Sequence, residues 1–130
     1  MKRISFNQRF INETGNDLLP GKIHTIRSNV DFWKRYEGQE VALFTWEGKP
    51  YRSKQKVFCV KRIVSVQEVY QACAIFTLKE TPFINGRRES IPSEKILKND
   101  GFEKWSDFHK WFYPYPSGKM GILHFTRFKY

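Results

Sequence analysis

Short apolar runs, separated by turn-forming residues, divide most of the chain into segments of strand length. Residues 41–46 and 54–66 are rich in Val, Ile and Phe, and shorter runs of this kind occupy 24–27, 72–78 and 121–128. Turn signals such as Glu47-Gly48-Lys49-Pro50 lie between these runs, and Pro20-Gly21 precedes the first of them. Short strands with frequent turns predict a small β-barrel.

Apart from one short helical turn that residues 30–36 could form, the helical pattern comes late in the chain. Pro92 and Glu94 suit the first turn of one short helix, which Asn99-Asp100-Gly101 ends. Ser106 is a favourable N-cap for a second helix over 107–112. Aromatic residues at three- to four-residue steps predict an apolar face for the core, and these are Phe102, Trp105, Phe108 and Phe112.

These elements predict one α+β domain over residues 1–130, mostly β with short helices inserted late. A chain of 130 residues is most simply a single domain. It buries roughly two-thirds of its unfolded surface and folds without disulfides or metals. Aromatic residues make up 17% of the chain, which is enough for a substantial core.

The Asn85-Gly86 pair lies between two extended flanks. Asn-Gly in that setting predicts a type I′ hairpin turn. Such a turn would lift Arg87 and Arg88 onto an exposed tip or an adjoining strand.

The charge balance favours a polyanionic partner. Lys and Arg number 23 against 13 Asp and Glu, giving a net charge of +10. This excess attracts phosphates at long range and releases counterions on binding. Nucleic acid or a phosphorylated nucleotide is therefore the partner that charge alone predicts.

Metal, cofactor and membrane are not indicated. Cys59 and Cys73 have no C-x-x-C spacing, and the three histidines are scattered, so neither a metal site nor a cofactor is expected. No run approaches the roughly 18 apolar residues of a membrane span. The basic start lacks an apolar signal core, so we expect a cytoplasmic protein.

The densest cluster of usable chemistry is the segment 18–27. Lys22, His24, Thr25 and Arg27 follow a Pro-Gly turn and enter a strand. In a regular strand Thr25 and Arg27 share a face, whereas His24 points to the other. Thr25 and Arg27 are thus expected in one pocket, with Lys22 entering from the turn and His24 left to core packing or the surface.

The residues Gly21-Lys22, Thr25 and Arg27, after an apolar pair, resemble the signature of the ASCH domain family. Asn99-Asp100-Gly101-Phe102 and the aromatic helix after it are similar to the family's later acidic-Gly-Phe segment, and 121–126 is similar to its last strand. The resemblance covers about residues 6–130. It implies a PUA-like β-barrel.

The same resemblance implies several functions. ASCH domains are often RNA-binding modules, some small bacterial members remove the acyl group from N4-acetylcytidine, and others are linked to ribonuclease activity. By position, the catalytic residues of the amidohydrolases correspond to Lys22, Thr25 and Asp100. Here Lys22 follows Gly21 without the family's extra residue, and Asp100 stands where those enzymes have Glu.

The chemistry of this trio has two interpretations. Thr25 could act as a nucleophile if Lys22 takes its proton, with Asp100 orienting Lys22 or moving a proton to the leaving amine. Alternatively the three are an ordinary strand threonine, a turn lysine and a helix-ending aspartate. The leading prediction is a basic cleft that binds RNA or a nucleoside, with amidohydrolase and ribonuclease as alternatives.

Further basic residues lie among aromatic ones along the chain. Arg52 and Lys54 follow Tyr51, and Arg87 and Arg88 follow Phe83 at a short distance. Basic side chains among aromatic rings suit single-stranded nucleic acid, because phosphates pair and bases stack. A solvated basic face beside core aromatics is the other interpretation. Arg27 joins these four as a predicted ligand-binding residue.

Overall fold

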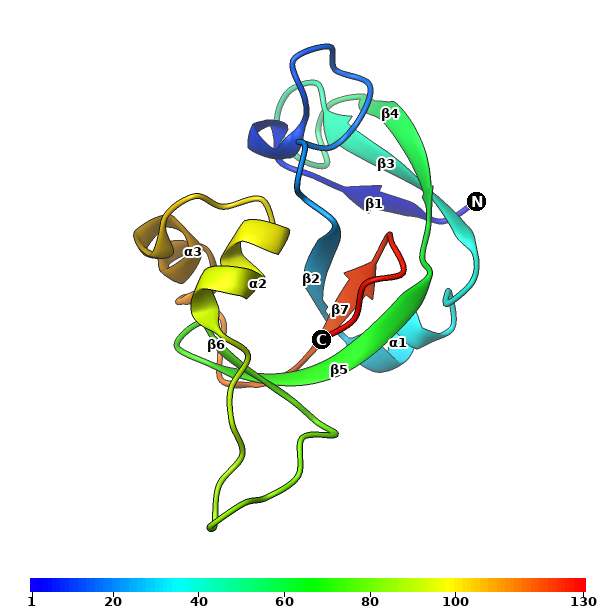
Figure 1. Cartoon of the computed structure of the whole chain (residues 1–130). Coiled ribbons are helices and arrows are strands. Elements are labelled where there is room, and N and C mark those ends of the chain that lie inside the picture. Colours follow the sequence, from blue (N-terminus) through cyan, green and yellow to red (C-terminus); the bar gives the residue numbers. More distant parts are fainter.

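Seven strands in two separate sheets and three short α-helices make up the fold. A computed structural model describes residues 1–130 (Figure 1). The strands are β1 (Arg3–Ser5), β2 (His24–Ser28), β3 (Glu40–Trp46), β4 (Gln55–Arg62), β5 (Ser65–Ala72), β6 (Ile75–Leu78) and β7 (Gly118–His124). The helices are α1 (Val30–Lys34), α2 (Ser93–Asn99) and α3 (Trp105–Phe112), with a single 3-10 turn at Gln8–Phe10.

The two sheets differ in size and in pairing. The smaller has the order β1-β3-β4, with β1 parallel to β3, and the larger is antiparallel with the order β2-β7-β5-β6. The chain crosses between the sheets from β1 to β2, from β2 to β3 and again from β4 to β5. This α+β architecture confirms the predicted class of mostly strands with short helices. Two of the helices, α2 and α3, come late as predicted, whereas α1 lies early, between β2 and β3.

The structure contains no closed barrel, because no ladder joins the edges of the two sheets. The apolar run 54–66, predicted as one strand, breaks at Ile63-Val64. The Ile63 N–H bonds to the Gln39 carbonyl, whereas the Val64 N–H bonds to the His124 carbonyl at 2.8 Å. Neighbouring residues therefore pair with different sheets, and the strand divides there.

Two local predictions have different outcomes. The Ile84 and Arg87 backbones bond to each other around Asn85 and Gly86, which both have positive φ, as a type I′ turn requires. The predicted N-cap at Ser106 is wrong, because α3 begins at Trp105 and Lys104 occupies the cap position. Its buried face, Phe108 and Phe112, is nevertheless the one that the aromatic spacing predicts.

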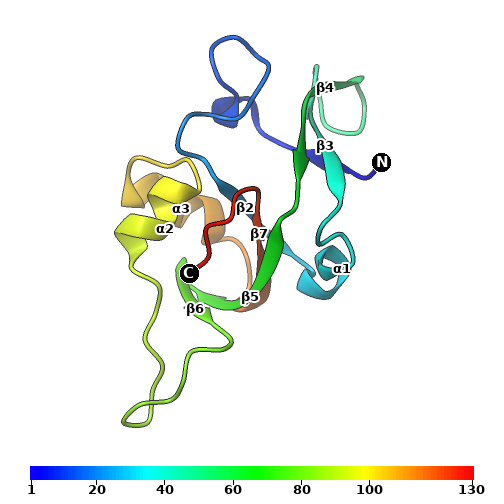
Figure 2. The same ribbon diagram turned by 45° about the vertical axis from the view of Figure 1, so that its right-hand side comes forward.

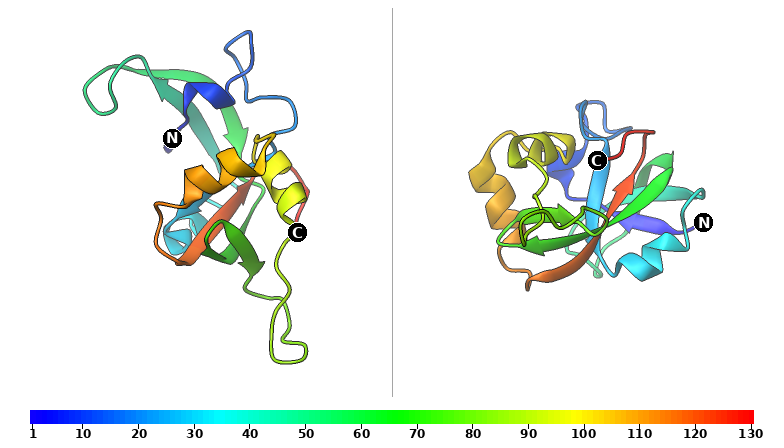
Figure 3. Two further views of the ribbon diagram at one scale, coloured as in Figure 1. Left: turned by 90° about the vertical axis from the view of Figure 1, so that its left-hand side faces the viewer. Right: turned by 60° about the horizontal axis from the view of Figure 1, so that its bottom comes forward.

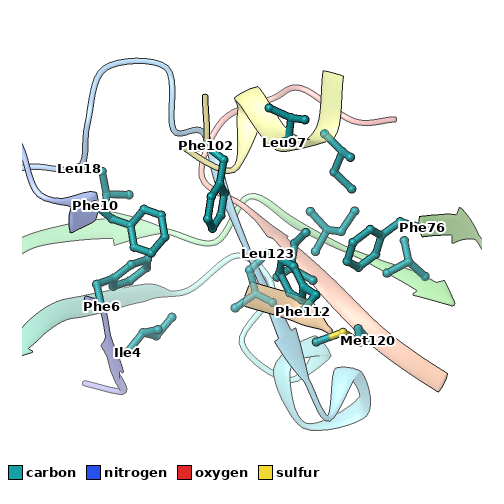
Figure 4. Close-up of a cluster of buried hydrophobic side chains, with 14 of the residues drawn as sticks. Ile4, Phe6, Phe10, Leu18, Phe76, Leu97, Phe102, Phe112, Met120 and Leu123 are labelled. Atoms are coloured by element: carbon teal, nitrogen blue, oxygen red, sulfur yellow. The ribbon is translucent and has the colours of Figure 1, made fainter. Parts of the chain in front are cut away.

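The core is largely aromatic and joins the helices to the sheets. Figure 4 shows Phe6 and Phe10 on one side of Phe102, with Phe76 and Phe112 farther along the same cluster. The Phe102 ring meets Phe10 and Phe108 edge to face, both at 5.3 Å between centroids. In Figure 1 and Figure 2, α2 and α3 lie together beside β2 and β7. The C-terminal end of α2 therefore lies close to the start of β2, where the Ile23 N–H donates to the Asn99 carbonyl.

Gly121 on β7 allows α1 to approach the sheet closely. A Cβ built at Gly121 would lie 2.9 Å from Val30 Cγ2 and 3.3 Å from the Val30 Cα. Gly121→Ala is expected to lower the free energy of unfolding in urea by about 1–3 kcal/mol, the usual cost of overpacking. The cost should be smaller in a Val30→Ala background, and an equal cost in both backgrounds would refute this contact as its cause.

No helix in the structure is both long enough and apolar enough to cross a membrane.

Candidate functional site

A type II turn delivers Lys22 to the interior. Pro20 and Gly21 occupy the two central positions, Gly21 has a φ of 91°, and the Lys22 N–H bonds back to the Leu19 carbonyl at 3.1 Å. Proline first and a positive φ second are what this turn needs. The Pro-Gly pair thus directs the lysine inward at the start of β2.

Asp100 is placed by the way α2 ends. The Gly101 N–H bonds to the Lys98 carbonyl and the Phe102 N–H to the Leu97 carbonyl, which together form a Schellman motif. Gly101 takes the left-handed conformation with a φ of 92°. A Cβ there would also lie 3.1 Å from Cδ of Lys22. Glycine is therefore required after Asp100 both for the turn and for the lysine stem.

Lys22 and Asp100 form a buried ion pair between these two segments. The Lys22 ammonium donates to the Asp100 main-chain carbonyl at 2.6 Å and to its carboxylate Oδ1 at 3.1 Å. The two side chains are only 2% and 4% exposed. The ammonium also lies 4.4 Å from the centroid of the Phe10 ring, a cation–π contact.

Burial sets the acid–base character of this lysine. Desolvation lowers the pKa of the Lys22 ammonium below its usual value, and the Asp100 carboxylate opposes that shift. The nearby positive charges of Arg27 and Arg9 lower this pKa further. Lys22 can therefore give up its proton more readily than a surface lysine.

Thr25 and Arg27 lie together on the next part of β2, as strand parity predicts. The Arg27 Nε donates to Thr25 Oγ1 at 3.1 Å, and its Nη2 donates to the Ser5 carbonyl at 2.5 Å. The guanidinium also stacks over Phe6 at 4.9 Å. Burial lowers the pKa of Arg27, and Asp100 opposes that shift. The Thr25 hydroxyl proton remains available to a ligand or a base.

One cavity of about 380 Å³ brings these four side chains together. Lys22, Thr25, Arg27 and Asp100 all line it. Most of its aromatic wall comes from six rings, namely Phe6, Phe10, Trp46, Tyr51, Trp111 and Tyr115. The cavity thus combines an ammonium, a guanidinium, a hydroxyl and a carboxylate with flat apolar surfaces.

The other predicted binding residues lie outside this cavity. Arg52 and Lys54 are exposed in and next to the β3–β4 hairpin, whose Pro50 and Tyr51 do reach the cavity. Arg87 and Arg88 lie on the loop between β6 and α2. In Figure 1 and Figure 3 this loop projects from the end of the molecule opposite the β3–β4 hairpin.

Sequence reasoning missed His24 and Tyr130 as parts of the site. His24 is fully buried, and its Nδ1 lies 3.3 Å from Asp100 Oδ1. Its Nε2 lies 2.6 Å from the Tyr130 hydroxyl. Strand parity correctly turned His24 away from Thr25, but Asp100 both lines the cavity with Thr25 and faces His24. No sequence signal links His24 to Tyr130, because 106 positions separate them.

No group of three or more His, Cys, Asp or Glu side chains is arranged to hold a metal ion. Cys59 and Cys73 are both free thiols, half-buried and exposed respectively.

Comparison with protein-family models, with curated proteins and with solved structures finds no match for this chain.

Proposed function

We propose that the cavity binds a nucleoside or a single unstacked base of RNA. One observation carries this proposal: Lys22, Thr25, Arg27 and Asp100 line a single cavity whose remaining wall is largely aromatic. Its volume, about 380 Å³, lies in the range of small-molecule sites, about 300–1,000 Å³. Few convergent polar groups on an apolar wall are typical of such sites.

The aromatic wall supports a planar ligand. Trp46 and Tyr51 contact each other with centroids 5.3 Å apart, and Tyr51 is 89% exposed although it lines the cavity. Bases released from a helix stack on such rings. The net charge of +10 attracts a phosphate-bearing ligand to the protein.

The ASCH resemblance points in the same direction, and a PUA-like fold is part of the proposal. The resemblance requires that the segment 21–27 and the segment 99–102 serve one site. They are more than 70 residues apart in sequence, and their ion pair and shared cavity support that requirement.

Hydrolysis of an N4-acylcytidine is a second candidate, favoured by the state of Lys22 and Thr25. The lysine has a lowered pKa, and the threonine, whose hydroxyl keeps a transferable proton, lines the same cavity. In this scheme Lys22, as the free amine, accepts the Thr25 proton while Oγ1 attacks the amide carbon. The cytidine amine leaves with a proton, and water then releases the acyl group from Thr25.

Tryptophan fluorescence tests the binding proposal, since Trp46 and Trp111 line the cavity. Titration with cytidine, cytidine monophosphate and a short single-stranded RNA should quench the emission in a saturable way. Affinity for the RNA should fall as salt rises, because phosphate contacts release counterions. Absence of saturable quenching by all three ligands at low salt would refute the proposal.

Chromatography tests the hydrolysis candidate separately. Incubation with N4-acetylcytidine should yield cytidine and acetate, Thr25→Ala should abolish this product, and Thr25→Ser should retain part of the rate. Turnover that survives Thr25→Ala would exclude the threonine as nucleophile. Binding without turnover would leave the binding proposal in place and reject the second candidate.

A further inference from the structure

A chain of hydrogen bonds runs behind the cavity from Asp100 to Tyr130. His24 links the two, with Nδ1 lying 3.3 Å from Asp100 Oδ1 and Nε2 lying 2.6 Å from the Tyr130 hydroxyl. The amide Nδ2 of Asn99 donates to the same hydroxyl at 3.0 Å. His24 has no exposed surface, so its two ring nitrogens depend on these protein partners.

The direction of each bond follows from Asp100. Its Oδ1 already accepts from the Lys22 ammonium, and an ionised carboxylate can only accept. The His24 Nδ1 must therefore donate. In a neutral imidazole the other nitrogen is then an acceptor, so the Tyr130 hydroxyl donates to Nε2. The Tyr130 oxygen in turn accepts from Asn99, so every bond in the chain joins one donor to one acceptor.

Aromatic rings pack around His24. Edge contacts with His124 and Tyr130 lie at 5.5 Å and 5.6 Å between centroids. Burial lowers the pKa of His124 to about 3, and burial raises the pKa of Tyr130. Asp100 with its partner Lys22 is the charged pair at this ring, and Arg27 and Arg9 act on Lys22 from beyond it.

Tyr130 is itself fixed on both sides of its backbone. Its N–H donates to Gln67 Oε1 at 3.0 Å, and its carbonyl accepts from Gln67 Nε2 at 3.1 Å. Gln67 Oε1 also contacts Nε2 of His124 at 2.8 Å. The phenol therefore has a defined position from which to orient His24.

We propose that His24 and Tyr130 are positioning residues that act through Asp100. The Asp100 carboxylate keeps the proton of His24 on Nδ1, and the Tyr130 hydroxyl donates to Nε2 and so fixes the ring. The Nδ1 proton in turn stabilises Oδ1 of Asp100 as an anion beside Lys22. Both side-chain bonds of the Asp100 carboxylate use Oδ1, which leaves Oδ2 free to accept from a ligand. The role of Oδ2 in holding a ligand rests on the proposed function. The hydrogen-bond chain from Asp100 through His24 to Tyr130 does not depend on it.

Long-range proton–nitrogen NMR of the labelled wild-type protein tests the chain without a ligand. His24 should carry its proton on Nδ1, the tautomer that the Asp100 contact requires. A proton on Nε2 would leave two acceptors facing each other at 3.3 Å and would overturn the proposal.

A pair of variants at position 24 tests the action through Asp100. His24→Asn can keep a donor where Nδ1 lies, whereas His24→Gln can replace only the Nε2 side. Both variants should have a lower free energy of unfolding than the wild type. Only His24→Gln should lose the donor that stabilises the Asp100 carboxylate as an anion. The Cε chemical shift of Lys22 reports its titration. Because the carboxylate then supports the ammonium less, the proton dissociation constant of Lys22 should be about tenfold larger in His24→Gln and unchanged in His24→Asn. Equal titrations in the two variants would overturn the proposal.

Tyr130→Phe gives the same test if the substitutions at position 24 do not fold. Loss of the hydroxyl should free the His24 ring to turn away from Asp100 and shift the Lys22 titration in the same direction, with the proton still on Nδ1. Tyr113→Phe, at a side chain that is 64% exposed, is the matched control and should change neither. No ligand is present, so a failure of nucleoside binding would leave these results standing. An unchanged Lys22 titration in Tyr130→Phe would overturn the proposal even if nucleosides bind.

Discussion

Replacing Asp100 with alanine is expected to lower the free energy of unfolding at neutral pH by about 3–5 kcal/mol. The substitution leaves the Lys22 ammonium buried without its counter-ion, and removing one partner of a buried pair has a cost of this size. Urea unfolding followed by tryptophan fluorescence measures the loss. Glu94→Ala, which breaks an exposed ion pair with Lys98 in the same helix, should cost no more than about 0.5 kcal/mol.

The loss in Asp100→Ala should become smaller as pH rises toward 10. The pKa of Lys22 is already lowered in the folded wild type and should fall further without Asp100. Between the folded pKa and the unfolded value near 10.5, the unfolded chain holds more protons, so stability rises with pH. That rise begins at lower pH in the variant. A deficit that stays constant or grows between pH 7 and pH 10 would contradict a buried, unpaired ammonium.

Tyr51→Asn should weaken nucleoside or RNA binding by about 5–150-fold while leaving the fold intact. Loss of one stacking ring costs about 1–3 kcal/mol, and Tyr51 lines the cavity although it is 89% exposed. Its φ of 63° lies in the left-handed region, which asparagine tolerates better than most residues. The variant should therefore be at least as stable as the wild type.

Titration of Tyr51→Asn beside Tyr113→Asn measures this effect, with urea unfolding of both as the check on stability. Tyr113 is also largely exposed but does not line the cavity. Equal affinities of the two variants would contradict a stacking role for Tyr51.

Local sequence patterns predicted the part of the site that is formed by residues close together in the sequence. The period of two along β2 placed Thr25 and Arg27 on one face, and the Pro-Gly turn brought Lys22 beside them. The end of α2 at Asp100 was also predictable, since a glycine follows it. The pairing of Asp100 with Lys22 came only from the ASCH resemblance, because residues 78 positions apart share no local signal.

Long-range pairing explains what the sequence did not predict. The apolar run 54–66 carries no mark of the break at Ile63-Val64, because that break depends on which strand each residue pairs with. For the same reason closure into a barrel could not be judged from strand lengths. The contact of His24 with Tyr130 likewise depends on where the chain after β7 is anchored, at Gln67.

Chemical-shift mapping with cytidine tests the central claim most directly. In a labelled protein, saturable shifts should appear at the Thr25 and Arg27 amides and at the indoles of Trp46 and Trp111, which all line the cavity. Amides of the loop between β6 and α2, including Arg87 and Arg88, should not move. Shifts confined to that loop, or no saturable shift at the cavity, would contradict the account.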